Sequence, residues 1–278
     1  MITGDPVGRS VDYELGHSER EFARLDHQAQ IIGPFTRQIF GEAGIGPGMR
    51  VLDVGSGNGQ VAVVVADLVG PAGEVVGTDR AAAAVSAARV RAQADGLHWV
   101  SFREGDPAAM AFERPFDAIV GRYVLMFQAD PAAMLRGLAR HLRPGGVITF
   151  HEPDWAGARS VPQAKSYDRC CQWIVETFRR LGTEAQMGAK LYTAFVAAGL
   201  PGPEMREFSL IGGGAGAAPW LYQLAELTRT MLPEMQRVGV VTPAEADIET
   251  LAERLQREVA DGDGIVVGRS EIGAWSRV

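Results

Sequence analysis

The segment that most constrains the fold is residues 51–62, VLDVGSGNGQVA, which predicts a buried strand, a glycine-rich loop and the start of a helix. Glycines stand at positions 55, 57 and 59, and glycine lets a backbone approach a ligand where a side chain would collide. The first turn of a helix also carries N–H groups without intrahelical partners. The segment therefore predicts a ligand-binding loop between a strand and a helix.

Apolar runs and helical stretches alternate along the chain after this point, which is typical of a parallel sheet wrapped by helices. The runs are 51–54, 75–78, 98–102, 118–120 and 147–150. Helices are predicted at about 59–69, 80–94 and 130–142. Further along, 163–199 and 219–260 favour helices, and 204–211 and 264–278 favour strands. The pattern predicts an α/β fold with helices on both faces of the sheet.

The glycine loop is compatible with more than one class of ligand. A turn without any ligand is the plainest interpretation. The dinucleotide fingerprint G-x-G-x-x-G fits only in part: counted from Gly55 its last position is Gln60, and counted from Gly57 it is Ala62. A P-loop is excluded because no Gly-Lys-Ser or Gly-Lys-Thr follows.

Residues 51–59 resemble the first motif of class I S-adenosylmethionine-dependent methyltransferases, with Asp53 at the strand end. The next predicted strand ends at Asp79, and 79 − 59 = 20 residues is the length that one helix and one strand consume. Other segments similar to the family follow in the same order, within residues 47–151. They are Gly105-Asp106-Pro107, the fourth-strand run 116–125 and the turn at 142–146.

The resemblance implies a Rossmann-like sheet of seven mostly parallel strands, with N-terminal and inserted helices forming a lid. It implies S-adenosyl-L-methionine as cofactor and S-adenosyl-L-homocysteine as product. In the family, an acid placed like Asp79 accepts the ribose hydroxyls, and one placed like Asp106 accepts the adenine amino group. Arg122 is expected to reach the methionine carboxylate or to position its loop.

Plainer roles stay open for these side chains, since Asp79 could be a surface acid, Asp106 an Asx-turn residue and Arg122 a solvated cation. The cofactor-binding residues expected are Tyr13, Arg24, Gln28, Asp53, Gly55, Ser56, Gly57, Asp79, Arg80, Gly105, Asp106, Pro107 and Arg122. No metal site is expected.

We expect three parts along the chain. Residues 1–46 form an N-terminal helical cap, with an amphipathic helix from Ser18 to about Ile32. Residues 47–151 form the cofactor-binding core. Residues 152–278 complete the sheet and carry helical insertions over the substrate.

Methyl transfer from a sulfonium is an in-line displacement, so the protein mainly aligns the reactants and excludes water. A general base is needed only when the nucleophile holds its proton tightly. Among His17, His27, His151 and Glu152, the last two are best placed because they follow the fifth predicted strand, where open parallel sheets bind ligands. We expect His151 and Glu152 to be catalytic, with a core or surface histidine as the alternative.

Aromatic residues outside the strand segments suit either an ordinary core or a flat, apolar acceptor held by stacking. They are Tyr13, Trp155, Trp173, Phe178, Trp220 and Tyr222. The flanking segments look like a bacterial group of small-molecule methyltransferases, some of which act in secondary metabolism. An arene or indole-like natural-product acceptor is therefore expected, with a non-catalytic cofactor-binding homologue or a dinucleotide-dependent oxidoreductase as alternatives.

Charge and composition limit the partners. A net charge of −7 and a pI near 5.3 disfavour nucleic acid, whose binding depends on Lys and Arg neutralising phosphates. No apolar run approaches the roughly 20 residues that span a bilayer. The two cysteines, Cys170 and Cys171, are adjacent and fit a reducing compartment. We expect a cytoplasmic protein with a small-molecule substrate, no nucleic-acid or membrane partner, and homodimerisation as an open possibility.

Overall fold

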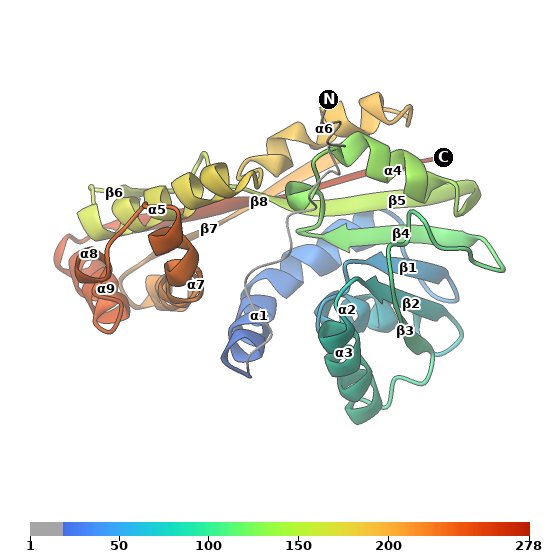
Figure 1. Cartoon of the computed structure of the whole chain (residues 1–278), viewed down its shortest axis with the longest axis horizontal. Helices are drawn as coiled ribbons and strands as arrows, with labels where there is room; N and C mark the ends of the chain where they lie inside the picture. The colour runs from blue at the N-terminus through green and yellow to red at the C-terminus, as the bar shows by residue number, and fades with distance from the viewer. Residues whose placement is uncertain (1–18) are drawn as a thin grey trace, which may run out of the picture.

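The computed structural model describes residues 19–278, with side chains from residue 24 onward. Its centre is an eight-stranded sheet in the order β3-β2-β1-β4-β5-β8-β6, with β7 paired to β8 (Figure 1). The parallel strands are β1 (Arg50–Val54), β2 (Glu74–Asp79), β3 (Val100–Glu104), β4 (Phe116–Arg122) and β5 (Leu142–Asp154). The antiparallel ones are β6 (Arg159–Val161), β7 (Glu204–Gly213) and β8 (Ile265–Arg277).

This architecture confirms the predicted fold class, and the strand count differs by one. The seven expected strands are present, and β6 is the additional one. It is only three residues long, too short for an apolar alternation to reveal it. It pairs with the first residues of β8, beyond the stretch that pairs with β5.

Helices cover both faces of the sheet. On one side lie α1 (Glu19–Glu42), α2 (Gln60–Val69) and α3 (Ala82–Ala94), and on the other α4 (Pro131–Ala139) and α6 (Met187–Ala197) (Figure 1). Apolar strand residues such as Leu52 and Ile119 are fully buried between these layers. Burial of both sheet faces explains why these strands are nearly continuous apolar runs.

A helical group stands beyond the ends of the parallel strands. It consists of α5 (Lys165–Leu181), α7 (Ala218–Arg237), α8 (Pro243–Ala246) and α9 (Leu251–Asp261), with a 3-10 turn at η2 (Gly214–Ala217). Another 3-10 turn, η1 (Leu125–Phe127), follows β4 and packs on α4 and β5. The long strand β8 runs from the sheet into this group (Figure 1). Within the described part of the chain, no helix combines the length and apolar character needed to cross a bilayer.

Helix α1 continues ten residues past the predicted end at Ile32, through Pro34 to Glu42. Pro34 cannot donate a backbone hydrogen bond, but this loss matters less than burial for the length of the helix. Ile39 and Phe40 are completely buried in the second half of the helix. A Cβ at Gly273 on β8 would lie 2.4 Å from Ile39, so the helix packs directly on the strand backbone. The predicted start at Ser18 lies outside the described residues.

Candidate active site

A cavity of about 500 Å³ opens where the parallel strands end, between the sheet, α1, α5 and α7. The structure brings most of the predicted cofactor residues into its wall. These are Arg24, Gln28, Gly55, Ser56, Gly57, Asp79, Arg80, Gly105, Asp106, Pro107 and Arg122. Asp53 lies behind the wall, and Tyr13 and His17 lie outside the described residues.

The glycine loop leaves open space at its centre. Gly55, Gly57 and Gly59 all have positive φ angles, which favour glycine. A Cβ at Gly57 would meet no atom within 4 Å, whereas one at Gly59 would lie 3.2 Å from Ala88. Gly59 therefore serves helix packing, and Gly57 borders space that a ligand can fill.

Asp79 holds the loop from the end of β2. Its carboxylate accepts hydrogen bonds from the Gly57 N–H (2.9 Å) and from the Ala81 N–H (2.9 Å). A carboxylate offers about four acceptor positions, so lone pairs remain for hydroxyl donors from a ligand. Asp79 lines the cavity and meets the geometric requirement for a ribose acceptor.

Asp106 forms the neighbouring part of the wall. One carboxylate oxygen accepts the Ala108 N–H (2.9 Å), as an Asx-turn residue does, and the other pairs with Arg80 (2.6 Å). The Asx-turn alternative is therefore present, and it coexists with a position in the cavity wall. The Arg80 pair neutralises much of the charge of Asp106.

Asp53 is completely buried, and neither carboxylate oxygen has a hydrogen-bond partner among the described residues. Burial raises the pKa of this carboxyl well above its usual range, and the charge of Arg122 opposes that shift. A buried acid without a partner is costly. Asp53 stands behind the glycine loop, whose open space at Gly57 and neighbouring Asp79 face the cavity and suit a ligand with polar groups.

Helix α1 closes one side of the cavity and contacts α7 across it. Arg24 donates to the Oε1 of Gln28 (3.0 Å), and Gln223 on α7 donates to the same oxygen (3.3 Å). His27 lies 3.3 Å from the carbonyl oxygen of Pro219 through its Nε2. The N-terminal helix and the helical group thus enclose the cavity from the side opposite the sheet.

His151 is not in the cavity wall. β5 extends to Asp154, so His151 lies within the strand and not after it. Its side chain is fully buried between Glu271 (Nε2 to carboxylate 2.9 Å) and Thr36 (Nδ1 to Oγ1 3.2 Å). Burial lowers the pKa of His151 despite the bond to Glu271, so the ring is neutral and both nitrogens are engaged.

Glu152 also lies outside the cavity wall and is fully buried. Its Oε1 accepts the N–H groups of Val124 and Leu125, both at 2.8 Å, and its Oε2 lies 3.4 Å from the Met126 nitrogen. Burial raises its pKa to about 8, more than these N–H donors lower it. At neutral pH the carboxyl is therefore protonated and anchors the turn after β4.

The raised pKa of Glu152 gives a test by the isosteric Glu152→Gln variant. The unfolded chain loses this proton near pH 4.5, whereas the folded protein keeps it up to about pH 8. The stability that this group contributes is thus complete below pH 4.5 and declines as the pH rises to 8. At about 1.4 kcal/mol per pH unit, urea unfolding should show wild type losing roughly 3 kcal/mol more than Glu152→Gln between pH 5.5 and 7.5. Parallel pH profiles for the two proteins would show that Glu152 is ionised in the fold.

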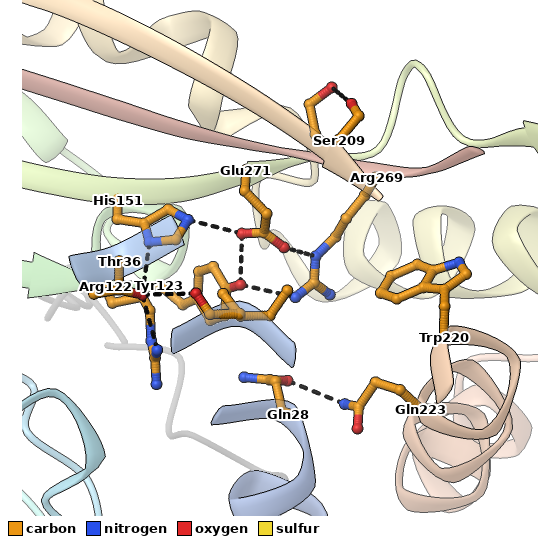
Figure 2. Close-up of polar contacts among 12 residues, drawn as sticks. Gln28, Thr36, Arg122, Tyr123, His151, Ser209, Trp220, Gln223, Arg269 and Glu271 are labelled. Atoms are coloured by element: carbon orange, nitrogen blue, oxygen red, sulfur yellow. Dashed lines mark hydrogen bonds and ion pairs between the residues drawn. The ribbon is translucent and has the colours of Figure 1, made fainter. Parts of the chain in front are cut away.

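Sequence reasoning did not single out three side chains that the structure places at the cavity or directly behind it: Tyr123, Arg269 and Glu271. Figure 2 shows them joined beside His151. Tyr123 donates to Glu271 (2.6 Å), and Arg269 donates to both the Tyr123 hydroxyl and Glu271 (2.9 Å each). Tyr123 and Arg269 line the cavity, and Tyr123 has a φ of 57°, a strained value for a tyrosine. The sequence signal that could have found them was the pair Arg269 and Glu271, two charged residues two positions apart in a strand that is otherwise buried.

The predicted lid aromatics divide into two groups. Trp155 and Phe178 line the cavity, and the Trp220 ring lies behind them, 6.3 Å from the ring of Trp155. Trp173 packs on the apolar core, and Tyr222 is half exposed against His27. The apolar wall also includes Met126, Phe127, Met134 and Leu227.

Comparison with known proteins agrees with this geometry. A family described as "Methyltransferase domain" matches residues 45–199, more than half of the chain. Nocamycin O-methyltransferase of Saccharothrix syringae is 38% identical over 121 residues, 43% of each chain. A 2-phytyl-1,4-naphtoquinone methyltransferase of Synechococcus elongatus is 37% identical over 113 residues, 38% of this chain and 48% of that protein. The matches thus span less than half the length of these relatives.

Solved structures share the fold at low sequence identity. A putative methyltransferase from Bacillus halodurans is 20% identical with a TM-score of 0.56, covering 87% of this chain and 97% of that one. A geranyl diphosphate C-methyltransferase from Streptomyces coelicolor, solved with S-adenosyl-L-homocysteine, is 16% identical with a TM-score of 0.54, covering 98% and 89%. The family match, the fold and the glycine loop agree: the chain belongs to the class I S-adenosylmethionine-dependent methyltransferases.

Proposed function

We propose that this protein transfers a methyl group from S-adenosyl-L-methionine to a small, largely apolar and aromatic acceptor. The observation that carries the proposal is a single cavity with two kinds of wall. One part contains the glycine loop, Asp79 and Asp106, and another contains Trp155, Phe178 and their apolar neighbours. A polar cofactor and an apolar acceptor can therefore meet in one enclosed space.

The residues in the polar part fit the cofactor. The Asp79 carboxylate is suited to the ribose hydroxyls and Asp106 to the adenine amino group, while Arg24, Gln28 and Arg122 are suited to the amino-acid end. When bound, S-adenosyl-L-methionine supplies an electrophilic methyl group on a sulfonium. The backbone at Gly57 leaves room for the ligand to approach the loop.

The contribution of the chain itself is alignment and exclusion of water. α1, α5 and α7 enclose the cavity, and the apolar side chains from η1, α5 and α7 limit entry of solvent. We propose that His151 and Glu152 position the wall instead of touching the acceptor. His151 supports Glu271 and Thr36, and Glu152 supports the turn at 124–126.

The class of acceptor is supported by the relatives as well as by the wall. The 2-phytyl-1,4-naphtoquinone named for the Synechococcus enzyme combines a flat ring system with an apolar phytyl chain. The acidic balance of the chain disfavours nucleic acid as acceptor. We propose that the protein acts in the cytoplasm. Homodimerisation stays an open prediction.

A transfer assay with cofactor labelled in its methyl group tests this function. Wild-type protein is incubated with a panel of flat aromatic acids, phenols and indoles, and extracts are analysed for labelled product. Labelled product that depends on the protein supports the proposal. Tight binding of S-adenosylhomocysteine without any product from the panel would favour the non-catalytic homologue instead.

Replacing Asp79 with alanine is expected to weaken S-adenosylhomocysteine binding by about 10- to 150-fold. The lost charged hydrogen bonds correspond to about 1.5 to 3 kcal/mol. Titration calorimetry measures the change, with Asp67→Ala as a matched control because Asp67 is an exposed residue on α2 paired with Arg37. Unchanged affinity in a folded Asp79→Ala protein would remove Asp79 from the cofactor site.

A further inference from the structure

The cavity wall contains a buried cation that the cofactor residues do not account for. Arg269 lies on β8, separated from the strand of the glycine loop by β4 and β5, and it is only 4% exposed. Its guanidinium carbon lies 5.0 Å from the ring centre of Tyr123, 5.1 Å from Trp155 and 5.7 Å from Trp220. An arginine is thus held among aromatic rings in the apolar part of the cavity.

The hydrogen bonds of Arg269 leave one terminal nitrogen available. Nε donates to Glu271 and Nη2 donates to the Tyr123 hydroxyl, both at 2.9 Å. Nη1 has no hydrogen-bond partner among the described residues, and Figure 2 shows one guanidinium nitrogen that no dashed line reaches. Because Arg269 lines the cavity, this unpaired nitrogen is placed to donate a hydrogen bond to a ligand atom.

Glu271 offsets part of the positive charge of Arg269 but leaves Nη1 free to donate to a ligand. It lies outside the cavity wall, and its two oxygens already accept from Arg269, His151 and Tyr123. Burial alone would raise its pKa, but Arg269 and His151 hold that pKa at about 2, so the glutamate is ionised and positions the guanidinium. The cation faces the cavity and its counterion faces away.

The charged residues of the cavity wall also favour an anionic ligand. Among the described residues that line the cavity, Arg24, Arg80, Arg122 and Arg269 outnumber Asp79 and Asp106, and Arg80 and Asp106 pair with each other. Arg24 and Arg122 are assigned to the amino-acid end of the cofactor, which leaves Arg269, among the aromatic rings, as the cation that favours a negatively charged acceptor. No acidic residue among the described cavity-lining residues belongs to β5, α5, α7 or β8.

We propose that the acceptor is an aromatic carboxylate, and that Arg269 binds its carboxylate through Nη1 while Trp155 and the apolar wall contact its ring. Tyr123 and Glu271 act as positioning residues, because they orient the guanidinium. The inference rests on the proposed function and narrows its substrate class. Recognition of carboxylate by a preorganised arginine gives a charge-assisted hydrogen bond.

Matched pairs of ligands that differ only in charge test this inference. Wild-type protein saturated with S-adenosylhomocysteine is titrated with 1-naphthoate and 1-naphthamide, and with indole-3-carboxylate and indole-3-carboxamide, following tryptophan fluorescence. We expect at least one acid to bind about tenfold or more tighter than its amide. Equal affinity within every pair, or no binding by any acid, would overturn the proposal.

Two variants test whether Arg269 causes the preference for the acid over its amide. Arg269→Met with Glu271→Gln removes both buried charges together, which disturbs a fold less than removing one, and should reduce the preference to within about twofold. Arg269→Lys keeps the partner of Glu271 and should weaken the preference about fivefold. Arg159→Met, an exposed arginine on the neighbouring strand β6, is the control and should behave as wild type.

Binding of S-adenosylhomocysteine separates this inference from the proposed function. Its affinity should stay within about twofold of wild type in all these variants, since Arg269 is assigned to the acceptor. A large loss of affinity for S-adenosylhomocysteine in the Arg269 variants would place this residue in the cofactor site and overturn the inference. Failure of wild-type protein to bind S-adenosylhomocysteine would instead overturn the proposed function itself.

Discussion

Replacing Gly57 with valine is expected to lower the affinity for S-adenosylhomocysteine by about a hundredfold or more. Two effects act together at this position. A valine is strained at a φ of 52°, and its side chain would extend into open space bordering the cavity, where the ligand is expected. A hundredfold loss corresponds to about 2.7 kcal/mol, which calorimetric titration resolves easily.

Gly70→Val is the matched control for this variant. Gly70 also has a positive φ of 66° and no atom within 4 Å of an added Cβ, but it ends α2 away from the cavity. Both variants carry backbone strain, so both should lose stability, while only Gly57→Val should lose the ligand. Equal affinities in the two variants would mean that the loop does not contact the cofactor.

Replacing Glu271 with alanine is expected to destabilise the fold by about 3 to 5 kcal/mol. The change leaves the buried Arg269 without its counterion and removes the acceptor of His151 and Tyr123. A cation left unpaired in the interior costs far more than a lost surface contact. Urea unfolding at pH 7 measures the difference in the free energy of unfolding.

Glu176→Ala provides the comparison for an exposed ion pair. Glu176 pairs with Arg179 and Arg180 on the surface of α5. Its removal should leave the unfolding midpoint unchanged within error. A Glu271→Ala protein as stable as wild type would show that the buried group around Arg269 is not formed in solution.

The glycine loop and the strands on either side of it were predictable because their determinants are local in sequence. A strand, three glycines and a helix fit within residues 51–62, and the predicted parallel strands around them are confirmed. The same local order predicted the placement of Asp79 and Asp106 in one wall, which the structure shows. Their roles toward the cofactor stay predictions, as does the division at residues 46 and 151.

The group formed by Tyr123, Arg269 and Glu271 could not be predicted because its residues come from distant segments. Tyr123 and Arg269 are 146 residues apart, and Tyr123 and Glu271 are 148 apart. Their contact depends on the antiparallel placement of β8 beside β5, which no local pattern specifies. The same reason explains the long α1, because the burial of its second half depends on β8.

His151 and Glu152 illustrate a limit of placing residues by strand order alone. The apolar run at 147–150 predicts where β5 begins to be buried but not where it ends. The strand continues to Asp154 because β8 provides it with partners as far as Ser270. Two polar residues expected at an open strand end are therefore enclosed beside the cavity, and their role there stays a proposal.

Calorimetric titration of the wild-type protein with S-adenosylhomocysteine, and separately with NAD⁺, tests the central claim most directly. The two ligands distinguish a methyltransferase loop from the dinucleotide loop that the glycine spacing matches only in part. We predict saturable one-to-one binding of S-adenosylhomocysteine with micromolar affinity, on the order of −8 kcal/mol, and no saturable heat with NAD⁺. Binding of NAD⁺ alone, or of neither ligand, would contradict the account.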